Sequence, residues 1–237
     1  MPTIRAVLFD LDDTLFDHAH AMSHALAALR ADEPAFATWT TEYLEARHGE
    51  VLEVLHQEVL AGRLSIDAAR EERFRRLLTM TESAALGRRR AVALARLYRE
   101  TYKQGWRAVP GAIELLTWLK EAGYGTAVVT NNLTLEQRAK LAGCGLAPGI
   151  DHLITSEDVG VAKPDPIIFE AALSAVGVTA PEAILVGDAW QADVVGGRAA
   201  GLRTVWLNRK GAPSPDPSVP ELPSLEPLDR ARAVLRL

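Results

Sequence analysis

The sequence is poor in cysteine and in basic charge, and it lacks long apolar runs. Its single cysteine, Cys144, excludes an internal disulfide framework. No run of about 18 apolar residues occurs, so we expect no segment that spans a membrane. The first apolar run is too short, and too soon followed by charge, for a signal peptide. The formal net charge of -5 provides no basic field that would attract a nucleic acid polymer or an anionic membrane surface.

These absences together predict a cytoplasmic protein whose partner is a small molecule. The chain has 237 residues, 48% of them hydrophobic, which is enough for one core domain with an insertion. Both a monomer and a homodimer are compatible with the sequence.

Short apolar runs alternate with helical patterns over most of the chain. The runs are typical of strands buried on both faces, and they lie at residues 4–9, 125–130, 152–155, 183–187 and 203–207. Helical patterns lie at 111–123, 133–145, 165–177 and 191–201. The alternation predicts an α/β fold with a Rossmann-like parallel sheet, in which ligands bind outside the carboxyl ends of the strands.

Residues 18–104 interrupt this alternation with helical patterns only. We expect an inserted α-helical domain there, and a catalytic core made of residues 1–17 and 105–237. Helices are predicted at 20–30, 35–49, 51–62 and 66–78, with Gly49 and Gly62 as stops and Ser65 as an N-cap. The proline-rich tail at 211–228 is expected to run over the surface and to add a last edge strand.

Acidic residues gather directly after two of the predicted strands. Asp10 and Asp12 follow the first strand in FDLDDTLFD, and Asp188 and Asp193 follow the fourth in LVGDAWQAD. Two carboxylates about 5 Å apart repel by roughly 3 kcal/mol at an effective dielectric constant near 20, so the pair requires a cation. Oxygen ligands of this kind suit Mg²⁺. The alternative for a single aspartate is a turn or helix cap, which we retain for Asp13 and Asp17, while Asp193 can also complement a helix N-terminus.

Two further polar positions suit a phosphate group. Thr130 ends the second strand, where its hydroxyl and the main-chain amide of Asn131 could hold a phosphate oxygen or cap a helix. Lys163 precedes Pro164 in a chain with only five lysines against twenty-one arginines, although a surface charge is the alternative. A carboxylate nucleophile, a second carboxylate for proton transfer, a metal and a lysine are the components of phosphoryl transfer.

These residues and their order resemble the haloacid dehalogenase-like (HAD) hydrolase superfamily, and the resemblance covers the whole chain. FDLDDT matches the first motif DxDx[TV] of that family, VVTNN the second, the Lys163-Pro164 site the third and GDAWQAD the acidic fourth. The resemblance implies a Mg²⁺-dependent phosphomonoesterase with Asp10 as the nucleophile that forms an aspartyl phosphate and Asp12 as the acid/base. It also implies that Thr130 and Lys163 bind phosphate, and that Mg²⁺ is held by Asp10, Asp188 and the main-chain carbonyl of Asp12.

Details of the motifs resemble the branch with bacterial pyrimidine 5'-nucleotidases and N-acylneuraminate-9-phosphatases. A small phosphorylated metabolite is therefore expected as substrate, with a nucleoside monophosphate as the leading class. Many family members have Asn where this chain has Ala192, which weakens the expected role of Asp193 in orienting Lys163 or a metal-bound water. A dehalogenase is disfavoured because Asp12 supplies a proton-transfer group that dehalogenases lack. A phosphosugar mutase and a non-catalytic protein that binds a phosphorylated ligand remain alternatives.

In this branch the insertion would be a cap that closes over the substrate and excludes water. Candidates for substrate specificity in the cap are His18, His20, Trp39, Arg47, His48 and Arg73. Packing in the cap core is the simpler explanation for Trp39, and solvated faces are the simpler explanation for the arginines and histidines. Trp190, in the last motif, could line the pocket or pack beneath it.

Overall fold

The computed structural model describes residues 3–81 and 87–237 and divides into two compact units. The first unit comprises Met1–Asp17 and Arg107–Leu237, and the second comprises His18–Trp106. The sequence prediction ended the insertion at residue 104, where helix α4 (Gly87–Gln104) ends, so the observed boundary lies two residues later. No helix among the described residues is both long enough and apolar enough to cross a membrane.

The first unit is built on a six-stranded parallel sheet with the strand order β3-β2-β1-β4-β5-β6. The strands are β1 (Ala6–Phe9), β2 (Gly125–Thr130), β3 (His152–Thr155), β4 (Ala183–Gly187), β5 (Arg203–Leu207) and β6 (Glu221–Leu222). Five strands coincide with the predicted apolar runs, except that β1 begins two residues later than its run. The sixth is the edge strand expected from the proline-rich tail. The fold class is therefore confirmed.

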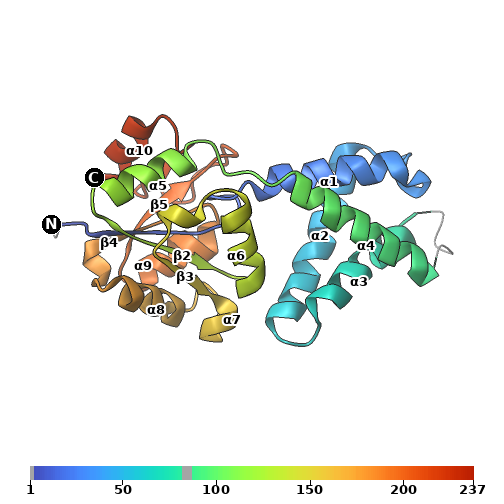
Figure 1. Cartoon of the computed structure of the whole chain (residues 1–237), viewed down its shortest axis with the longest axis horizontal. Helices are drawn as coiled ribbons and strands as arrows, with labels where there is room; N and C mark the ends of the chain where they lie inside the picture. Colours follow the sequence, from blue (N-terminus) through green and yellow to red (C-terminus); the bar gives the residue numbers. More distant parts are fainter. Residues whose placement is uncertain (1–2, 82–86) are drawn as a thin grey trace. The chain divides into compact units, whose positions relative to one another are not determined.

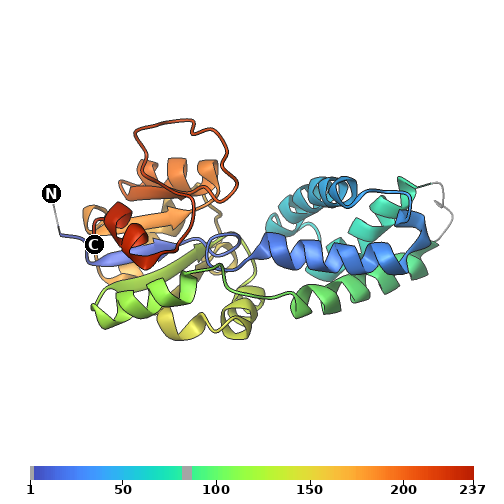
Figure 2. The ribbon, with the colours of Figure 1, turned by 90° about the horizontal axis from the view of Figure 1, so that it is seen from above.

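Helices cover both faces of this sheet, which explains why its central strands are apolar throughout (Figures 1 and 2). Over one face, α8 (Pro166–Val176) packs with α9 (Gly196–Ala199), and over the other α5 (Ala112–Glu121) packs with α10 (Leu228–Leu235). The remaining helices of the unit are α6 (Thr134–Gly143), α7 (Ser156–Val159) and the short turns η2 (Ala147–Gly149) and η3 (Ala180–Glu182).

Strand β1 lies in the middle of the sheet, and its register aligns the residues that follow it with those of its neighbours. Phe9, its last residue, pairs with Val128 of β2 and with Val186 of β4. The residues one or two positions further along β1, β2 and β4 therefore come together at the carboxyl edge, where Asp10, Thr130 and Asp188 lie.

The segment predicted as one helix at 191–201 is instead a π-helical turn, η4 (Trp190–Val195), followed by α9. The wider turn carries Asp193, and π-helical turns are frequent at functional sites.

The second unit is helical, as predicted. It contains α1 (His18–Asp32), η1 (Pro34–Phe36), α2 (Thr41–Leu60), α3 (Ile66–Thr79) and α4, and residues 82–86 of the predicted insertion lie outside the described residues. The prediction that Gly49 ends a helix is wrong, because α2 runs through it. Leu44, Val51 and Leu55 continue one apolar stripe into the core past the glycine, which outweighs a local cost of about 1 kcal/mol.

The other expected caps of this unit are present. Gly62 follows α2 with a φ of 68°, in the left-handed region that glycine adopts without strain. The Ser65 hydroxyl accepts a hydrogen bond from the Ala68 amide and caps α3. Trp39 packs against the core of the unit, as expected.

Candidate active site at the carboxyl edge of the sheet

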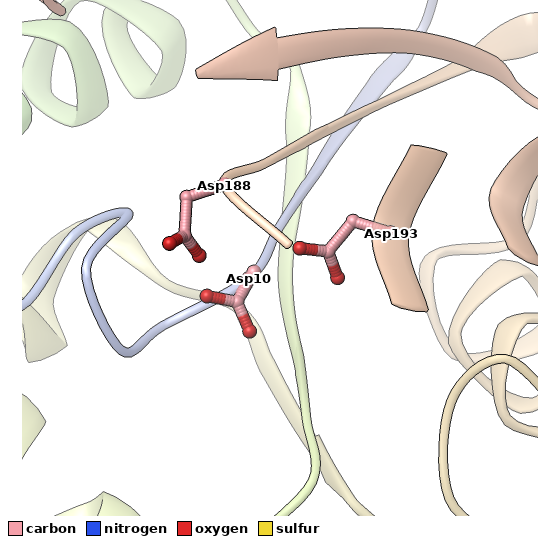
Figure 3. A group of neighbouring side chains, drawn as sticks. All are labelled: Asp10, Asp188 and Asp193. Carbon is pink, nitrogen blue, oxygen red and sulfur yellow. The ribbon is translucent and has the colours of Figure 1, made fainter. Parts of the chain in front are cut away.

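Three carboxylates gather at the carboxyl edge of the sheet (Figure 3). Asp10 follows β1, and its amide continues the ladder by donating to the Val186 carbonyl at 2.9 Å. Asp188 follows β4, and its amide donates to the Thr14 hydroxyl at 3.1 Å. Asp193 comes from η4, and oxygen atoms of the three carboxylates lie within 4.8 Å of one another. Two neighbouring strands and the turn after one of them thus place three acids in one site.

Lys163 lies between two of these acids. Its Nζ is 2.7 Å from Asp10 Oδ1 and 2.6 Å from Asp193 Oδ1, and all three side chains are buried. Three carboxylates and one ammonium (-3 + 1) leave a formal charge of -2 among these four residues. A divalent cation is the counter-ion that would neutralise this site.

Burial and neighbouring charges shift the pKa values of these groups. Burial, together with the charge of Asp193, raises the pKa of Asp10 to about 7 despite the opposing effect of Lys163. Burial and the neighbouring Asp10 raise the pKa of Asp188 to about 8. Burial alone would lower the pKa of Lys163, but Asp10 and Asp193 outweigh it and raise that pKa above its ordinary value.

Gly187 permits the close approach of Asp193 to β4. A Cβ atom at position 187 would lie 2.3 Å from Asp193 Cγ, a distance that no side chain tolerates. The Asp193 carboxylate also accepts a hydrogen bond from the Ala189 amide at 3.0 Å. The contact between Asp193 and Lys163 is therefore present even though the fourth motif has Ala192, which predicts a weaker contact.

The carboxylate of Asp12 lies in a different environment from the other three. Its Oδ1 is 2.5 Å from Lys140 Nζ, and its Oδ2 accepts a hydrogen bond from Gln137 at 2.9 Å. The sequence suggested that the side chains of Asp10, Asp12 and Asp188 converge, whereas Asp193 takes the place of the Asp12 side chain in the observed cluster. The carboxylate of Asp12 instead faces α6.

The other two predicted phosphate-site residues are Thr130, which Gln137 connects with Asp12, and Asn131, which contacts Lys163. Thr130 is buried, and its hydroxyl accepts a hydrogen bond from Gln137 Nε2 at 2.7 Å. The Asn131 side chain accepts from the Lys163 amide at 2.6 Å and donates to the Lys163 carbonyl at 2.9 Å. Asn131 thus fixes the main chain of Lys163, a contact that the sequence did not suggest.

Asp13 and Asp17 lie outside the carboxylate cluster. Asp13 occupies a turn with a φ of 66°. Asp17 is buried, where it accepts from Arg107 Nε at 2.8 Å and from Arg209 Nη2 at 3.0 Å. Burial alone would raise the pKa of Asp17, but these hydrogen bonds lower it. Asp17 therefore anchors the loop after β1 to two arginines.

Sequence reasoning missed Gln137 and Lys140, which contact the predicted site residues. They lie three residues apart in α6, on its buried side. The scarcity of lysine, which drew attention to Lys163, applies equally to Lys140.

The specificity candidates of the helical unit have different environments. His18 Nδ1 is 2.6 Å from the Tyr102 hydroxyl, His20 stacks on His24, and Arg47 forms an ion pair with Glu50. Trp39 packs against Phe36 and Tyr43. The two remaining candidates are His48 and Arg73.

His48 and Arg73 contradict the expectation of solvated faces. His48 is completely buried, and burial followed by the charges of Arg73 and His18 lowers its pKa well below the usual value. Arg73 Nη1 is 3.4 Å from His48 Nε2, and its Cζ lies 5.8 Å from the centre of the Tyr98 ring. Among the described residues, no carboxylate forms an ion pair with Arg73. Its Nε is buried and has no hydrogen-bond partner among these residues.

Trp190 is half-buried and packs against a small apolar cluster of the first unit. Its ring meets Trp206 edge to face at a centroid distance of 5.1 Å, beside Val194 and Val219. Trp206 Nε1 in turn donates to the Asp188 carbonyl at 2.9 Å. The tryptophan pair therefore supports the main chain of an acidic site residue.

The chain is similar to known hydrolases in both sequence and fold. Residues 4–201 match the model of the family described as haloacid dehalogenase-like hydrolase. A phosphoserine phosphatase of Thermus thermophilus is 35% identical over 94% of this chain and 88% of its own. The pyrimidine 5'-nucleotidase PynA of Streptococcus pneumoniae is 29% identical over 85% of this chain and 83% of its own.

A solved structure has the same fold. The HAD-hydrolase YfnB of Bacillus subtilis, in a crystal structure bound to magnesium, superposes with a TM-score of 0.75 at 27% identity and 100% coverage of both chains. The chain belongs to the haloacid dehalogenase-like hydrolases, as its motifs indicated.

Proposed function

We propose that this protein is a Mg²⁺-dependent phosphomonoesterase that acts through an aspartyl phosphate on Asp10. The observation that carries the proposal is the buried ammonium of Lys163, shared by Asp10 and Asp193 beside a third carboxylate at a strand end. This arrangement holds one acid as a nucleophile and supplies positive charge for a transferred phosphoryl group.

The donor set of the site fits Mg²⁺. Asp10 and Asp188 offer hard oxygen ligands, and burial and neighbouring carboxylates raise the pKa values of both carboxyls, so a cation would favour their charged forms. We assign Asp10, Asp188 and the main-chain carbonyl of Asp12 as ligands, and Asp193 as the acid that orients Lys163. A bound Mg²⁺ would neutralise charge on the carboxylates and on the phosphoryl oxygens.

The protein residues then perform two displacement steps. A carboxylate oxygen of Asp10 attacks phosphorus, the bond from phosphorus to the leaving oxygen breaks, and the carboxyl group of Asp12 gives its proton to that oxygen. In the second step the Asp12 carboxylate takes a proton from water, whose oxygen attacks the phosphorus of the aspartyl phosphate. Phosphate leaves and the Asp10 carboxylate is restored. Thr130 and Lys163 bind the phosphoryl oxygens in both steps.

The substrate we propose is a small phosphorylated metabolite, with a nucleoside monophosphate as the leading class. The names of the two curated relatives support a small phosphomonoester, one of them a nucleotide and the other an amino acid phosphate. We assign the helical unit the role of a cap. Within it, Arg73 is our candidate for binding the carboxylate of a substrate such as phosphoserine, because Arg73 Nε is buried without a hydrogen-bond partner among the described residues. A nucleoside monophosphate has no second anionic group and would not use this residue.

Phosphate release from a panel of UMP, dTMP, phosphoserine, phosphoglycolate and sugar phosphates tests the proposal. We expect release from at least one phosphomonoester, and loss of release on removal of Mg²⁺ with a chelator. Transfer of phosphate within the substrate without release would favour a mutase. Tight binding without turnover would favour a non-catalytic relative, and either result would overturn the proposed function.

A further inference from the structure

Helix α6 presents two polar side chains to the predicted site residues from its buried side. Gln137 is completely buried and Lys140 is 5% exposed. Burying an amide and an ammonium is costly unless both are paired, so their partners indicate why they are there. Each pairs with a residue of the proposed active site.

The side-chain amide of Gln137 connects Thr130 with Asp12. Its Nε2 donates to Thr130 Oγ1 at 2.7 Å and to Asp12 Oδ2 at 2.9 Å, which uses both hydrogens of the amide. The opposite orientation of the amide would set its oxygen against the carboxylate. While Asp12 is a carboxylate, as in the step in which it takes a proton from water, its charge therefore fixes the direction in which Gln137 points.

This direction has a consequence for the Thr130 hydroxyl. A hydroxyl has one proton and two lone pairs, and one lone pair of Thr130 is occupied by Gln137. Its proton therefore remains available, and the described residues provide no acceptor for it. The oxygens of a phosphate monoester dianion accept hydrogen bonds and have no proton to donate, so a threonine held in this way is oriented as a donor to a phosphoryl group.

Lys140 completes the restraint on Asp12. Its Nζ is 2.5 Å from Asp12 Oδ1, while Gln137 holds Oδ2. One residue of α6 thus holds each oxygen, so the carboxylate cannot rotate without losing a contact. Geometry of this kind matters because a displacement of about 1 Å in a reacting group can reduce a rate about 100-fold.

We propose that Gln137 and Lys140 are positioning residues: Gln137 directs the Thr130 proton toward the phosphoryl group, and together with Lys140 it fixes the carboxylate of Asp12 for proton transfer. The inference rests on the proposed phosphomonoesterase function. It assigns α6 a role in both substrate binding and leaving-group protonation.

The Gln137 contact is tested by a double-mutant cycle. Gln137→Met keeps the volume and removes both donors, and Thr130→Val removes the hydroxyl. Alone, Gln137→Met is expected to raise KM at least fivefold, and in the Thr130→Val background the same change should alter KM less than twofold, because the contact is already absent. Equal effects on KM in both backgrounds would overturn the assignment.

The Lys140 contact is tested with two leaving groups. An alkyl phosphate needs a proton on its leaving oxygen, whereas p-nitrophenyl phosphate leaves readily without one. Lys140→Met is expected to lower kcat for the alkyl phosphate at least tenfold more than for p-nitrophenyl phosphate, and Lys140→Arg should restore part of the difference. Equal losses for both substrates would overturn this part of the inference.

Arg138→Met is the matched control, because Arg138 is an exposed residue of the same helix. Its kinetic constants should equal those of the wild type, and thermal unfolding of all variants identifies any that fail to fold. If the wild type releases no phosphate, the proposed function itself fails. If the wild type is active while Gln137→Met and Lys140→Met behave like Arg138→Met, only the inference fails.

Discussion

The stability of the metal-free protein should fall as the pH rises from about 4 to about 8, and Mg²⁺ should reverse that fall. The pKa of Asp10 rises from 3.8 to about 7 on folding. The folded protein therefore holds this proton more tightly than the unfolded chain. The stability that the proton confers is fully present below about pH 4 and is lost as the pH rises through about 7.

The size of the effect follows from the shift. About 3 pKa units at 1.36 kcal/mol each correspond to on the order of 4 kcal/mol for Asp10 alone. Asp188, with a pKa of about 8, extends the loss to higher pH. Mg²⁺ at about 100 times its Kd would add about 2.7 kcal/mol, or roughly 5–10 °C in Tm for a chain of this size.

The assay compares Tm values with a chelator and with Mg²⁺ at about pH 5 and about pH 8. We expect a clear increase with Mg²⁺ at the higher pH and little at the lower, where protons occupy the carboxyls. Asp188→Asn should raise the Tm of the metal-free protein at the higher pH and remove most of the Mg²⁺ effect. Asp229→Asn, at an exposed acid, should leave both unchanged. An equal Mg²⁺ effect at both pH values would show that Mg²⁺ and these protons do not compete for the same carboxyls.

Three further substitutions test separate parts of the structure. Gly187→Ala should displace Asp193, reduce the free energy of unfolding in a urea titration by about 1–3 kcal/mol and lower phosphate release more than tenfold. Gly49→Ala is the control: the space around Gly49 is open, so the substitution should stabilise α2 by roughly 0.5–1 kcal/mol in the same titration. Asp17→Asn should lower the free energy of unfolding by about 1–3 kcal/mol at neutral pH. Because folding lowers the pKa of Asp17, the difference in free energy of unfolding between the variant and the wild type should shrink as the pH falls below about 4. A difference that does not change with pH would contradict the role of the arginine contacts. Arg73→Met should reduce kcat/KM about 10- to 100-fold for phosphoserine or phosphoglycolate but less for phosphoethanolamine, which lacks a carboxylate; equal losses would exclude Arg73 as an anion-binding residue.

The sheet was predictable from the sequence because its signal is local. A strand buried on both faces is an apolar run whatever it pairs with, so β2, β3, β4 and β5 begin and end where their runs do. The aspartates after β1 and β4 were predictable for the same reason, since the carboxyl ends of parallel strands meet at one edge. Gly49 was misleading because its local preference was outweighed by packing in the helical unit.

The contacts of α6 were not predictable, because they depend on how distant segments meet. Lys140 and Asp12 are separated by 128 residues, and no local pattern shows that the lysine reaches the acid. The same limit applies to the cluster of three carboxylates. The choice of Asp193 over the Asp12 side chain depends on the π-helical turn and on the space that Gly187 leaves.

Phosphate release by the wild type and by Asp10→Asn, with and without Mg²⁺, on the best substrate of the panel tests the role of Asp10 most directly. We expect Mg²⁺-dependent release by the wild type and none above background by a folded Asp10→Asn protein. Near wild-type release by that variant would contradict the assignment of Asp10 as the nucleophile.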